Sequence, residues 1–311
     1  MQERTVYVDG IFVPESKASI SVFDRGVQWG DSVYDAARTY NRRPFKVREH
    51  IERLYSSCLY TRMPLPLSID EMEKITNEVV ERNMPLVASD HDDMIWWSVT
   101  RGVNPPSRSV LDCKRANVIV STFPVPFFNF AKPMMVGAKV VTPSIRRTPS
   151  QCVDAKAKIS GKMNHILADL EAKGSDPEAY SLMLDINGNI SENSSGNIFW
   201  VKGGQLFTPT SRNILVGVSR TTIFELASRL NVEVVEGDFT LLDLYTADEA
   251  FLSSTPYGIL PIATLNGAEI GRETPGPTTK SLTESWSRLV GIDIVSQAQK
   301  CSAPATPVLS P

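Results

Sequence analysis

Three lysines, Lys156, Lys158 and Lys162, crowd the stretch AKAKISGKMNH around a break at Ser160 and Gly161. Lys158 stands where an extended segment meets this break, ahead of an expected helix. A lysine held at such a strand end and partly desolvated loses proton affinity and becomes an amine nucleophile, as Schiff-base chemistry on carbonyl groups requires. Most lysines are solvated surface groups, so this stretch alone leaves both interpretations open.

A glutamate and a helix start further along the chain could complete such chemistry. Glu192 lies in a predicted strand, ISENSSGNIFWVK, that follows a hairpin turn, and taken alone it would usually be an exposed charge at a sheet edge. Gly217, Val218 and Ser219 open a predicted helix, whose free N–H groups and positive dipole end attract a dianion such as phosphate. The hydroxyl of Ser219 could also simply cap that helix.

Eight motifs follow one another along nearly the whole chain except its tail: VFDRGVQWGDSVYDAAR, REHIERL, VTRG, AKISG, SENSSGNIFWVK, ILVGVSR, ADEAFLSSTPYGILPI and GPTTK. In these motifs and in their order the chain resembles the class IV aminotransferases, the fold-type IV enzymes that use pyridoxal 5'-phosphate. This resemblance implies a mixed α+β fold in two domains, of the D-amino acid aminotransferase kind. It also implies small amine, amino acid and 2-keto acid substrates, and a homodimer.

The resemblance makes Lys158 the lysine that forms an aldimine with the cofactor and later moves a proton between substrate and cofactor. Two features favour Lys158 over Lys162: the VDxxxK lead-in, and the thirteen residues that separate Lys158 from Glu171. Lys156 and Lys162 are then ordinary neighbours, whose positive charges favour a neutral Lys158 amine.

The resemblance also implies how the rest of the cofactor is held. Glu192 would keep the pyridine nitrogen protonated, so that the ring can withdraw electrons from the substrate carbon. Arg53, in REHIERL, would pair with the phosphate bidentately, and the loop LSSTPYG would close over phosphate and substrate carboxylate. The implied cofactor-binding residues are Arg53, Glu192, Gly217, Val218, Ser219, Ser254 and Thr255.

The substrate-binding residues match the family less closely. Many branched-chain members carry a tyrosine five residues after the lysine, where this chain has Met163. Trp96 falls near a position where relatives use Arg or Tyr for the substrate carboxylate; its ring could wall an apolar pocket or belong to the core. Arg38 and the loop residue Arg108 are alternative partners for that carboxylate. The expected substrate residues are Tyr34, Arg38, Trp96, Arg108 and Pro256.

The leading hypothesis is a transaminase that passes an amino group from a small amine or amino acid to a 2-keto acid in two half-reactions. AKISG resembles branched-chain amino acid aminotransferases, whereas VDxxxK, VYDAA and VTRG favour (R)-selective amine or D-amino acid transaminases. One alternative is an elimination enzyme of the aminodeoxychorismate lyase kind, which would release pyruvate without an amino acceptor. Another is a binding protein that retains only the fold.

Hydrophobic periodicity predicts the elements that position these residues. A hairpin around Asp9 and Gly10 opens the chain, a helix begins near Val47, and a second covers residues 69–83 behind a capping box. Later segments are predicted as strands MIWWSVTRG, ANVIVSTFPV, AYSLMLD and QLFTPT, and as helices MNHILADLEAKG and SRTTIFELASRLNV. We expect an N-terminal α/β domain over 1–121, a linker over 122–134, a cofactor-binding domain over 135–298 and a disordered tail over 299–311.

The overall composition excludes several other classes. A net charge of −3 without a long basic run argues against binding to nucleic acid or to an anionic membrane. The four cysteines and three histidines show no metal-ligand spacing, so neither a metal site nor a disulfide framework is expected. No stretch approaches the roughly 18 apolar residues of a membrane span, and no signal core is present, which makes the cytoplasm the expected location.

Overall fold

The computed structural model describes residues 3–302, and the chain divides into two compact units. The first unit runs up to Val125 and includes residues 157–161; the second holds residues 126–156 and continues from Lys162. The mixed α+β, two-domain fold expected from the sequence is confirmed. The return of residues 157–161 to the first unit differs from the simple division expected, and it places Lys158 in a different unit from Glu192.

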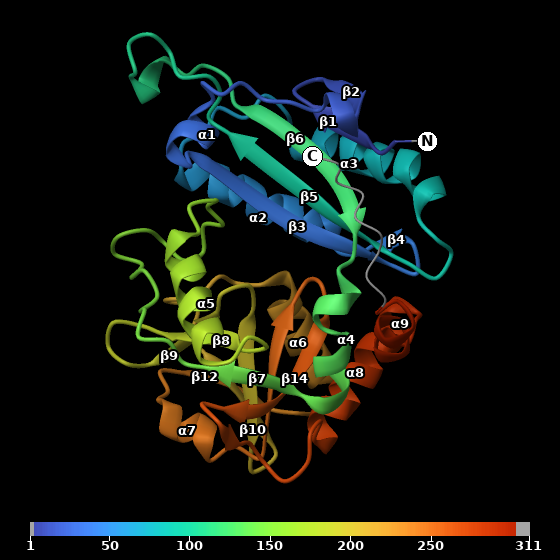
Figure 1. The fold of residues 1–311 in the computed structure, drawn as a ribbon, viewed down its shortest axis with the longest axis vertical. Coiled ribbons are helices and arrows are strands. Elements are labelled where there is room, and N and C mark those ends of the chain that lie inside the picture. The colour runs from blue at the N-terminus through green and yellow to red at the C-terminus, as the bar shows by residue number, and fades with distance from the viewer. Residues whose placement is uncertain (1–2, 303–311) are drawn as a thin grey trace. The chain divides into compact units, whose positions relative to one another are not determined.

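The first unit is an antiparallel sheet with α2 and α3 on one face (Figure 1), in the strand order β2-β1-β6-β5-β3-β4. Its strands are β1 (Thr5–Val8), β2 (Ile11–Pro14), β3 (Ser32–Tyr40), β4 (Arg43–Pro44), β5 (Asp93–Thr100) and β6 (Asn117–Pro124). Its helices are α1 (Arg25–Trp29), α2 (Val47–Tyr60) and α3 (Ile69–Asn83), with 3-10 turns at Glu15–Lys17, Met84–Leu86 and Val110–Asp112.

Local sequence features explain where these elements begin and turn. The β1–β2 hairpin turns at Asp9 and Gly10, both with positive φ, as that dipeptide favours. The predicted capping box is present at α3, where Ser68 and Glu71 each accept a hydrogen bond from the other's backbone N–H. The predicted hairpin, the helix expected to begin near Val47 and the helix expected over 69–83 are therefore confirmed.

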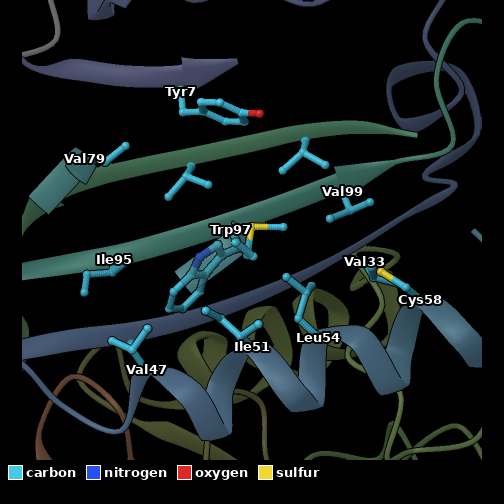
Figure 2. Packing of buried hydrophobic residues seen from close by; sticks show 14 of the residues in the cluster. Tyr7, Val33, Val47, Ile51, Leu54, Cys58, Val79, Ile95, Trp97 and Val99 are labelled. Atoms are coloured by element: carbon cyan, nitrogen blue, oxygen red, sulfur yellow. The ribbon is translucent and has the colours of Figure 1, made fainter. Parts of the chain in front are cut away.

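The core of the first unit lies between the sheet and helix α2 (Figure 2). Because side chains alternate along a strand, Ile95, Trp97 and Val99 of β5 point to the helices and are buried. Burying each such side chain contributes about 1.5–3 kcal/mol. The same alternation sends Trp96 to the opposite face of the sheet, where it is only partly buried.

The second unit contains a longer mixed sheet, in the order β12-β11-β10-β13-β14-β7-β8-β9, with β15 beside β14. Its strands are β7 (Ala138–Val141), β8 (Tyr180–Leu184), β9 (Ile190–Asn193), β10 (Asn197–Lys202), β11 (Gln205–Pro209), β12 (Val234–Gly237), β13 (Glu249–Ser254), β14 (Gly258–Leu265) and β15 (Ala268–Glu269). Its helices are α4 (Ala131–Val136), α5 (Met163–Ser175), α6 (Val218–Arg229), α7 (Leu241–Tyr245), α8 (Pro277–Val290) and α9 (Ile294–Lys300), with a 3-10 turn at Phe127–Asn129.

The structure corrects three predictions made from the sequence. The segment ISENSSGNIFWVK is not one strand but two, because the Asn193 side chain accepts the N–H of Ser195 and forms a turn between β9 and β10. Regular structure enters the predicted linker, since β6 and α4 both reach into it. Helix α9 includes Gln299 and Lys300, which fall within the predicted tail; residues 303–311 lie outside the described residues.

Within residues 3–302, no helix is both long and apolar enough to span a membrane.

Candidate active site

Lys158 lies on a short extended segment beside the start of β3. Its carbonyl accepts the N–H of Tyr34 at 3.0 Å, and its own N–H donates to the hydroxyl of Ser57 on α2 at 3.0 Å. Its Nζ lies 4.7 Å from the centre of the Tyr34 ring. The backbone of Lys158 is thus fixed from two elements, while its amine faces an aromatic side chain predicted to line the site.

Tyr34 and Trp96 form an aromatic wall on the same face of the sheet. Their rings stack with centres 4.8 Å apart and an angle of 20° between planes. The indole N–H of Trp96 donates to the hydroxyl of Ser98 at 3.0 Å. Trp97 instead points into the core, where its N–H donates to Thr76. Trp96 thus lies on the face of the sheet opposite the helices, partly buried, and its role in binding substrate stays a prediction.

Arg53, predicted to bind phosphate, forms a buried ion pair between α2 and β3. Its Nε and Nη2 donate to the two oxygens of Asp35, each at 2.8 Å, and His50 lies 2.8 Å from the same carboxylate. Burial raises the pKa of Asp35, but Arg53 and His50 outweigh this effect and hold the pKa well below its ordinary value. Sequence reasoning missed Asp35 and His50, since a charge inside the sheet pattern gives no hint of its partner.

The two arginines proposed for the substrate carboxylate differ in their surroundings. Arg38 is buried, donates to the carbonyl of Thr39, and lies 3.6 Å from the carboxylate of Asp92. Arg108 is exposed in the loop before the 3-10 turn at Val110–Asp112, with a left-handed φ of 57°. Their roles in binding substrate therefore stay predictions.

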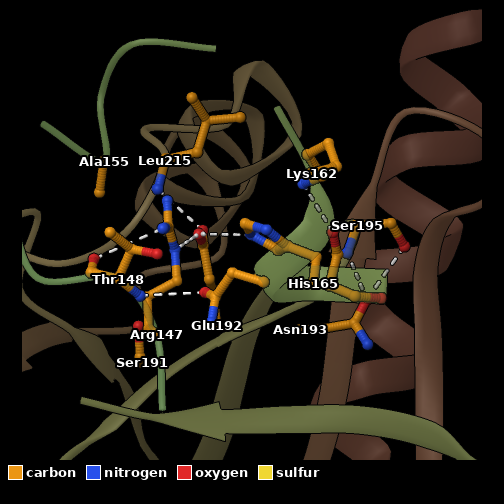
Figure 3. Close-up of polar contacts among 12 residues, drawn as sticks. Arg147, Thr148, Ala155, Lys162, His165, Ser191, Glu192, Asn193, Ser195 and Leu215 are labelled. Atoms are coloured by element: carbon orange, nitrogen blue, oxygen red, sulfur yellow. Dashed lines mark hydrogen bonds and ion pairs between the residues drawn. The ribbon is translucent and has the colours of Figure 1, made fainter. Parts of the chain in front are cut away.

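In the second unit, Glu192 of β9 is the centre of a buried polar network (Figure 3). One carboxylate oxygen accepts Nε–H of Arg147 at 2.7 Å, and the other accepts the N–H of Leu215 at 2.8 Å. Nε2 of His165 lies 3.7 Å from Glu192. Burial raises the pKa of Glu192, but His165, Arg147 and Lys162 outweigh it and lower the pKa to about 2. Glu192 is consequently a carboxylate at every physiological pH.

Arg147, which sequence reasoning missed, is itself held in place by α5. Asn164 donates to the carbonyl of Arg146 at 2.8 Å and accepts the N–H of Thr148 at 3.0 Å, so it grips the backbone on both sides of Arg147. The Arg147 N–H donates to the carbonyl of Leu184 in β8 at 2.8 Å. These backbone contacts aim the guanidinium at Glu192.

The start of α6 has the properties expected of a phosphate site. Gly217 is the N-cap and provides no side-chain cap, so Ser219 lies within the first turn and does not cap the helix. A Cβ at Gly217 would come within 2.4 Å of Oδ1 of Asn197, so a larger residue there would displace a neighbouring group. Asn197 also donates to the carbonyl of Leu215 at 2.9 Å. The backbone cradle left at Gly217, Val218 and Ser219 fits a dianion.

The loop after β13 completes this side of the second unit. Ser254 donates to the carbonyl of Ser195 at 2.6 Å, which joins this loop to the turn after Glu192. Gly196 allows the approach, because a Cβ there would lie 2.5 Å from the carbonyl of Ser253. Pro256 and Ser195 line a pocket of about 600 Å³. The loop after β13 thus contacts the turn that follows Glu192, and the roles of Ser254, Thr255 and Pro256 near a cofactor stay predictions.

Comparisons with known proteins agree with this chemistry. A family model described as Amino-transferase class IV matches residues 32–265. A putative branched-chain-amino-acid aminotransferase of Methanocaldococcus jannaschii is 34% identical over 284 residues, which cover 90% of this chain and 94% of the relative. A D-alanine aminotransferase of Listeria monocytogenes is 30% identical over 293 residues, covering 89% and 93%.

Among solved structures, a branched-chain amino acid aminotransferase of T.th. complexed with N-(5'-phosphopyridoxyl)-L-glutamate superposes with a TM-score of 0.83. It is 27% identical in sequence, and the match covers 94% of this chain and 95% of that chain. That protein holds a phosphopyridoxyl group, which is the type of cofactor that the sequence predicts here.

Proposed function

The chain belongs to the class IV aminotransferase family, and from that premise we propose that it transfers amino groups between a branched-chain amino acid and a 2-keto acid with pyridoxal 5'-phosphate. The observation that carries this proposal is Glu192, a buried carboxylate kept ionised and oriented by Arg147 and by the N–H of Leu215. Leu215 lies two residues before Gly217, so one short loop links the carboxylate to the phosphate cradle.

When bound, pyridoxal phosphate supplies an aldehyde that takes up the amino group and a ring that withdraws electrons from the substrate carbon. Glu192 would accept a hydrogen bond from the protonated ring nitrogen and so keep that proton in place. The first turn of α6 would bind the phosphate through its N–H groups. Lys158 would bind the aldehyde through Nζ, and the same amine would take and return the proton at the substrate carbon.

The aromatic wall beside Lys158 supports an apolar substrate side chain. Tyr34 and Trp96 present stacked rings, and Nζ of Lys158 lies over the first of them. An aliphatic side chain would remove this apolar surface from water, at about 25 cal/mol per Å². A charged substrate side chain would lose its hydration against these rings without gaining a comparable interaction. We therefore expect leucine, isoleucine and valine to be the amino acids that react.

A D-amino acid is the second candidate substrate. It is supported by the D-alanine aminotransferase of Listeria monocytogenes, which is nearly as similar to this chain as the branched-chain relative is. The two candidates differ in which face of the substrate carbon meets the lysine, so a test must compare enantiomers.

The test is a set of single half-reactions. The purified chain is loaded with pyridoxal phosphate and mixed separately with L-leucine, D-leucine, D-alanine and (R)-1-phenylethylamine, while the cofactor's absorbance is followed. We expect L-leucine to convert the cofactor to its amino form, and added 2-keto acid to reverse this. Faster conversion by D-leucine than by L-leucine would overturn the branched-chain proposal, and conversion by the amine alone would favour an (R)-amine transaminase.

We further propose a homodimer. Helix α1 buries none of its residues within this chain, and the apolar side chains of Val22, Phe23, Val27 and Trp29 are each more than half exposed. An exposed cluster of this kind is typical of an interaction surface. Light scattering in solution tests the proposal, and a monomeric mass would contradict it.

We also propose a cytoplasmic location. It is supported by the four cysteines, none of which forms a disulfide within residues 3–302, since thiols persist in the reducing cytosol.

A further inference from the structure

Lys162 stands where a lysine is unfavourable. It is the N-cap of α5, and its side chain makes no capping hydrogen bond. Helix starts favour Ser, Thr, Asp or Asn, and the helix dipole repels a positive charge there. Residues that break a local rule in this way are often retained for function. The sequence suggests that Lys162 is an ordinary neighbour of Lys158, but this does not explain why a lysine stands at the helix start.

The Lys162 side chain turns inward toward the turn that follows Glu192 (Figure 3). Its Nζ donates to the carbonyl of Ser194 at 2.9 Å, and the residue is only partly exposed. The same turn is held by Ser254 and by the side chain of Asn193. Lys162 thus ties the start of α5 to the end of β9, one turn of helix before His165.

Four ionisable groups are coupled electrostatically to this amine or to its neighbours. They are Glu192 from β9, Arg147 from the segment before α5, and His165 and Asp169 from α5 itself. The positive charges of Lys162 and Arg147 balance the negative charges of Glu192 and Asp169. A proton on His165 would give the whole cluster a net positive charge, which would oppose a protonated ring nitrogen at Glu192.

His165 is accordingly harder to protonate than an exposed histidine. Burial lowers the pKa of His165, and Lys162 and Arg147 add to this effect against the opposite influence of Glu192. Burial also lowers the pKa of Lys162, to about 8, although Glu192 acts against it. Lys162 hence carries its charge over the range in which a histidine would ordinarily gain a proton.

Resting on the aminotransferase function proposed above, we propose that Lys162 is a positioning residue that anchors the turn after Glu192 and whose positive charge, one helical turn from His165, disfavours a second positive charge there. Below about pH 8 the ammonium group does both. Glu192 then remains balanced by Arg147, and its charge stays available for the ring nitrogen. A Lys162 variant without charge would let His165 take up a proton at a higher pH. Glu192 would then interact with the protonated His165, and less of its charge would stabilise the ring nitrogen.

The first test needs no turnover. The full chain contains three histidines, so their ring resonances can be followed individually by NMR over pH, with His165 assigned by its loss in His165→Gln. We compare Lys162→Met, which removes the charge, with Lys162→Arg, which keeps it, and with Lys156→Met at the exposed lysine nearby. We expect the pKa of His165 to rise by about half a pH unit or more in Lys162→Met and to stay unchanged in the other two. An unchanged His165 titration in Lys162→Met would overturn the proposal.

The second test is the pH dependence of kcat in the same variants. We expect the acidic limb of Lys162→Met to move to higher pH, while Lys162→Arg and Lys156→Met keep the limb of the original chain. Equal acidic limbs in all four proteins would overturn the role in the reaction, even if His165 titrates as expected. If no form transfers amino groups, the aminotransferase proposal fails, and the NMR titration still decides whether Lys162 controls His165.

Discussion

At the level of single residues, Glu192 is the group whose surroundings are most specific. Unlike a surface glutamate, it is buried, each of its oxygens accepts an N–H, and Arg147 neutralises it. Losing one partner of a buried charge pair is costly, because the other charge is left without compensation. The arrangement thus keeps Glu192 as a carboxylate at a fixed position.

Replacing Glu192 with Gln tests whether the carboxylate itself is needed. The amide keeps the shape of the side chain but cannot balance a protonated ring nitrogen, so we expect kcat to fall by about 10²–10³-fold. Cofactor binding should persist, since the amide oxygen of Gln can still accept the N–H of Leu215, two residues before the phosphate cradle. Steady-state kinetics and cofactor titration measure both quantities, with the exposed Glu52→Gln as the control. A variant with unchanged kcat would remove the proposed role of Glu192.

The residues that the sequence did not reveal are those defined by a partner far along the chain. Arg147 lies 45 residues before Glu192, and nothing in its own neighbourhood marks it as a site residue. Lys162 resembles an ordinary neighbour in the sequence because it lies close to the more conspicuous Lys158. Lys158 and Glu192 could be proposed from the sequence because extended motifs of the family surround them.

At the level of elements, the loop from Leu215 to Gly217 connects β9, β10 and α6. The Glu192 carboxylate accepts the N–H of Leu215, and the Asn197 side chain donates to the carbonyl of Leu215. The first turn of α6 is therefore held relative to the carboxylate by two buried side chains. The phosphate cradle depends on this close approach as much as on its own N–H groups.

The substitution Gly217→Ala tests the cradle. The added Cβ would meet Oδ1 of Asn197 at 2.4 Å, so either the buried Asn197 side chain or the helix start must shift. We expect the affinity for pyridoxal phosphate to fall by about tenfold or more, while the affinity for pyridoxal, which lacks the phosphate, changes little. Gly174→Ala in α5, where a Cβ meets nothing within 4 Å, is the matched control. Equal losses for both ligands would contradict a phosphate-specific role.

Strong local signals predicted most elements correctly. The capping box placed the start of α3, and the Asp9-Gly10 turn placed the first hairpin, because each depends on neighbouring residues alone. The division of 190–202 into β9 and β10 was missed, because a turn made by the Asn193 side chain interrupts a pattern of apolar residues that otherwise continues. Tertiary contacts decided what the local pattern could not.

At the level of the whole molecule, the two buried carboxylates link stability to pH. Asp35 in the first unit and Glu192 in the second both have a pKa below the ordinary value. A carboxylate whose pKa is lower in the folded than in the unfolded chain stabilises the fold at pH values above its ordinary pKa. This stabilisation is lost as the pH falls from the ordinary pKa toward the folded-state pKa. For Glu192 that window lies between about 4.5 and about 2.

We therefore expect the free energy of unfolding to fall between about pH 5 and pH 3, and to fall less in Glu192→Gln than in the original chain. The variant is less stable at the higher pH but no longer has this carboxylate to protonate. Urea unfolding at both pH values measures the difference, with Glu52→Gln as the control. An equal loss in Glu192→Gln and the original chain would show that Glu192 is not held by its buried partners.

The division of the chain into units was only partly predictable. The passage out of the first unit after Val125 coincides with a proline-rich stretch that marks an interruption in the sequence. The return of residues 157–161 depends on hydrogen bonds with β3 and α2, and so short a segment carries too little pattern to indicate them. The segment that carries Lys158 was thus recognisable by its chemistry and not by its place in the fold.

The central claim is that Lys158, among three crowded lysines, binds the cofactor. Borohydride reduction of the chain loaded with pyridoxal phosphate fixes the cofactor on the lysine that holds it, and peptide mass spectrometry then identifies that lysine. We predict the phosphopyridoxyl group on Lys158, its loss in Lys158→Ala, and no label on Lys156 or Lys162. A label on Lys162 in the original chain, or full turnover by Lys158→Ala, would contradict the account.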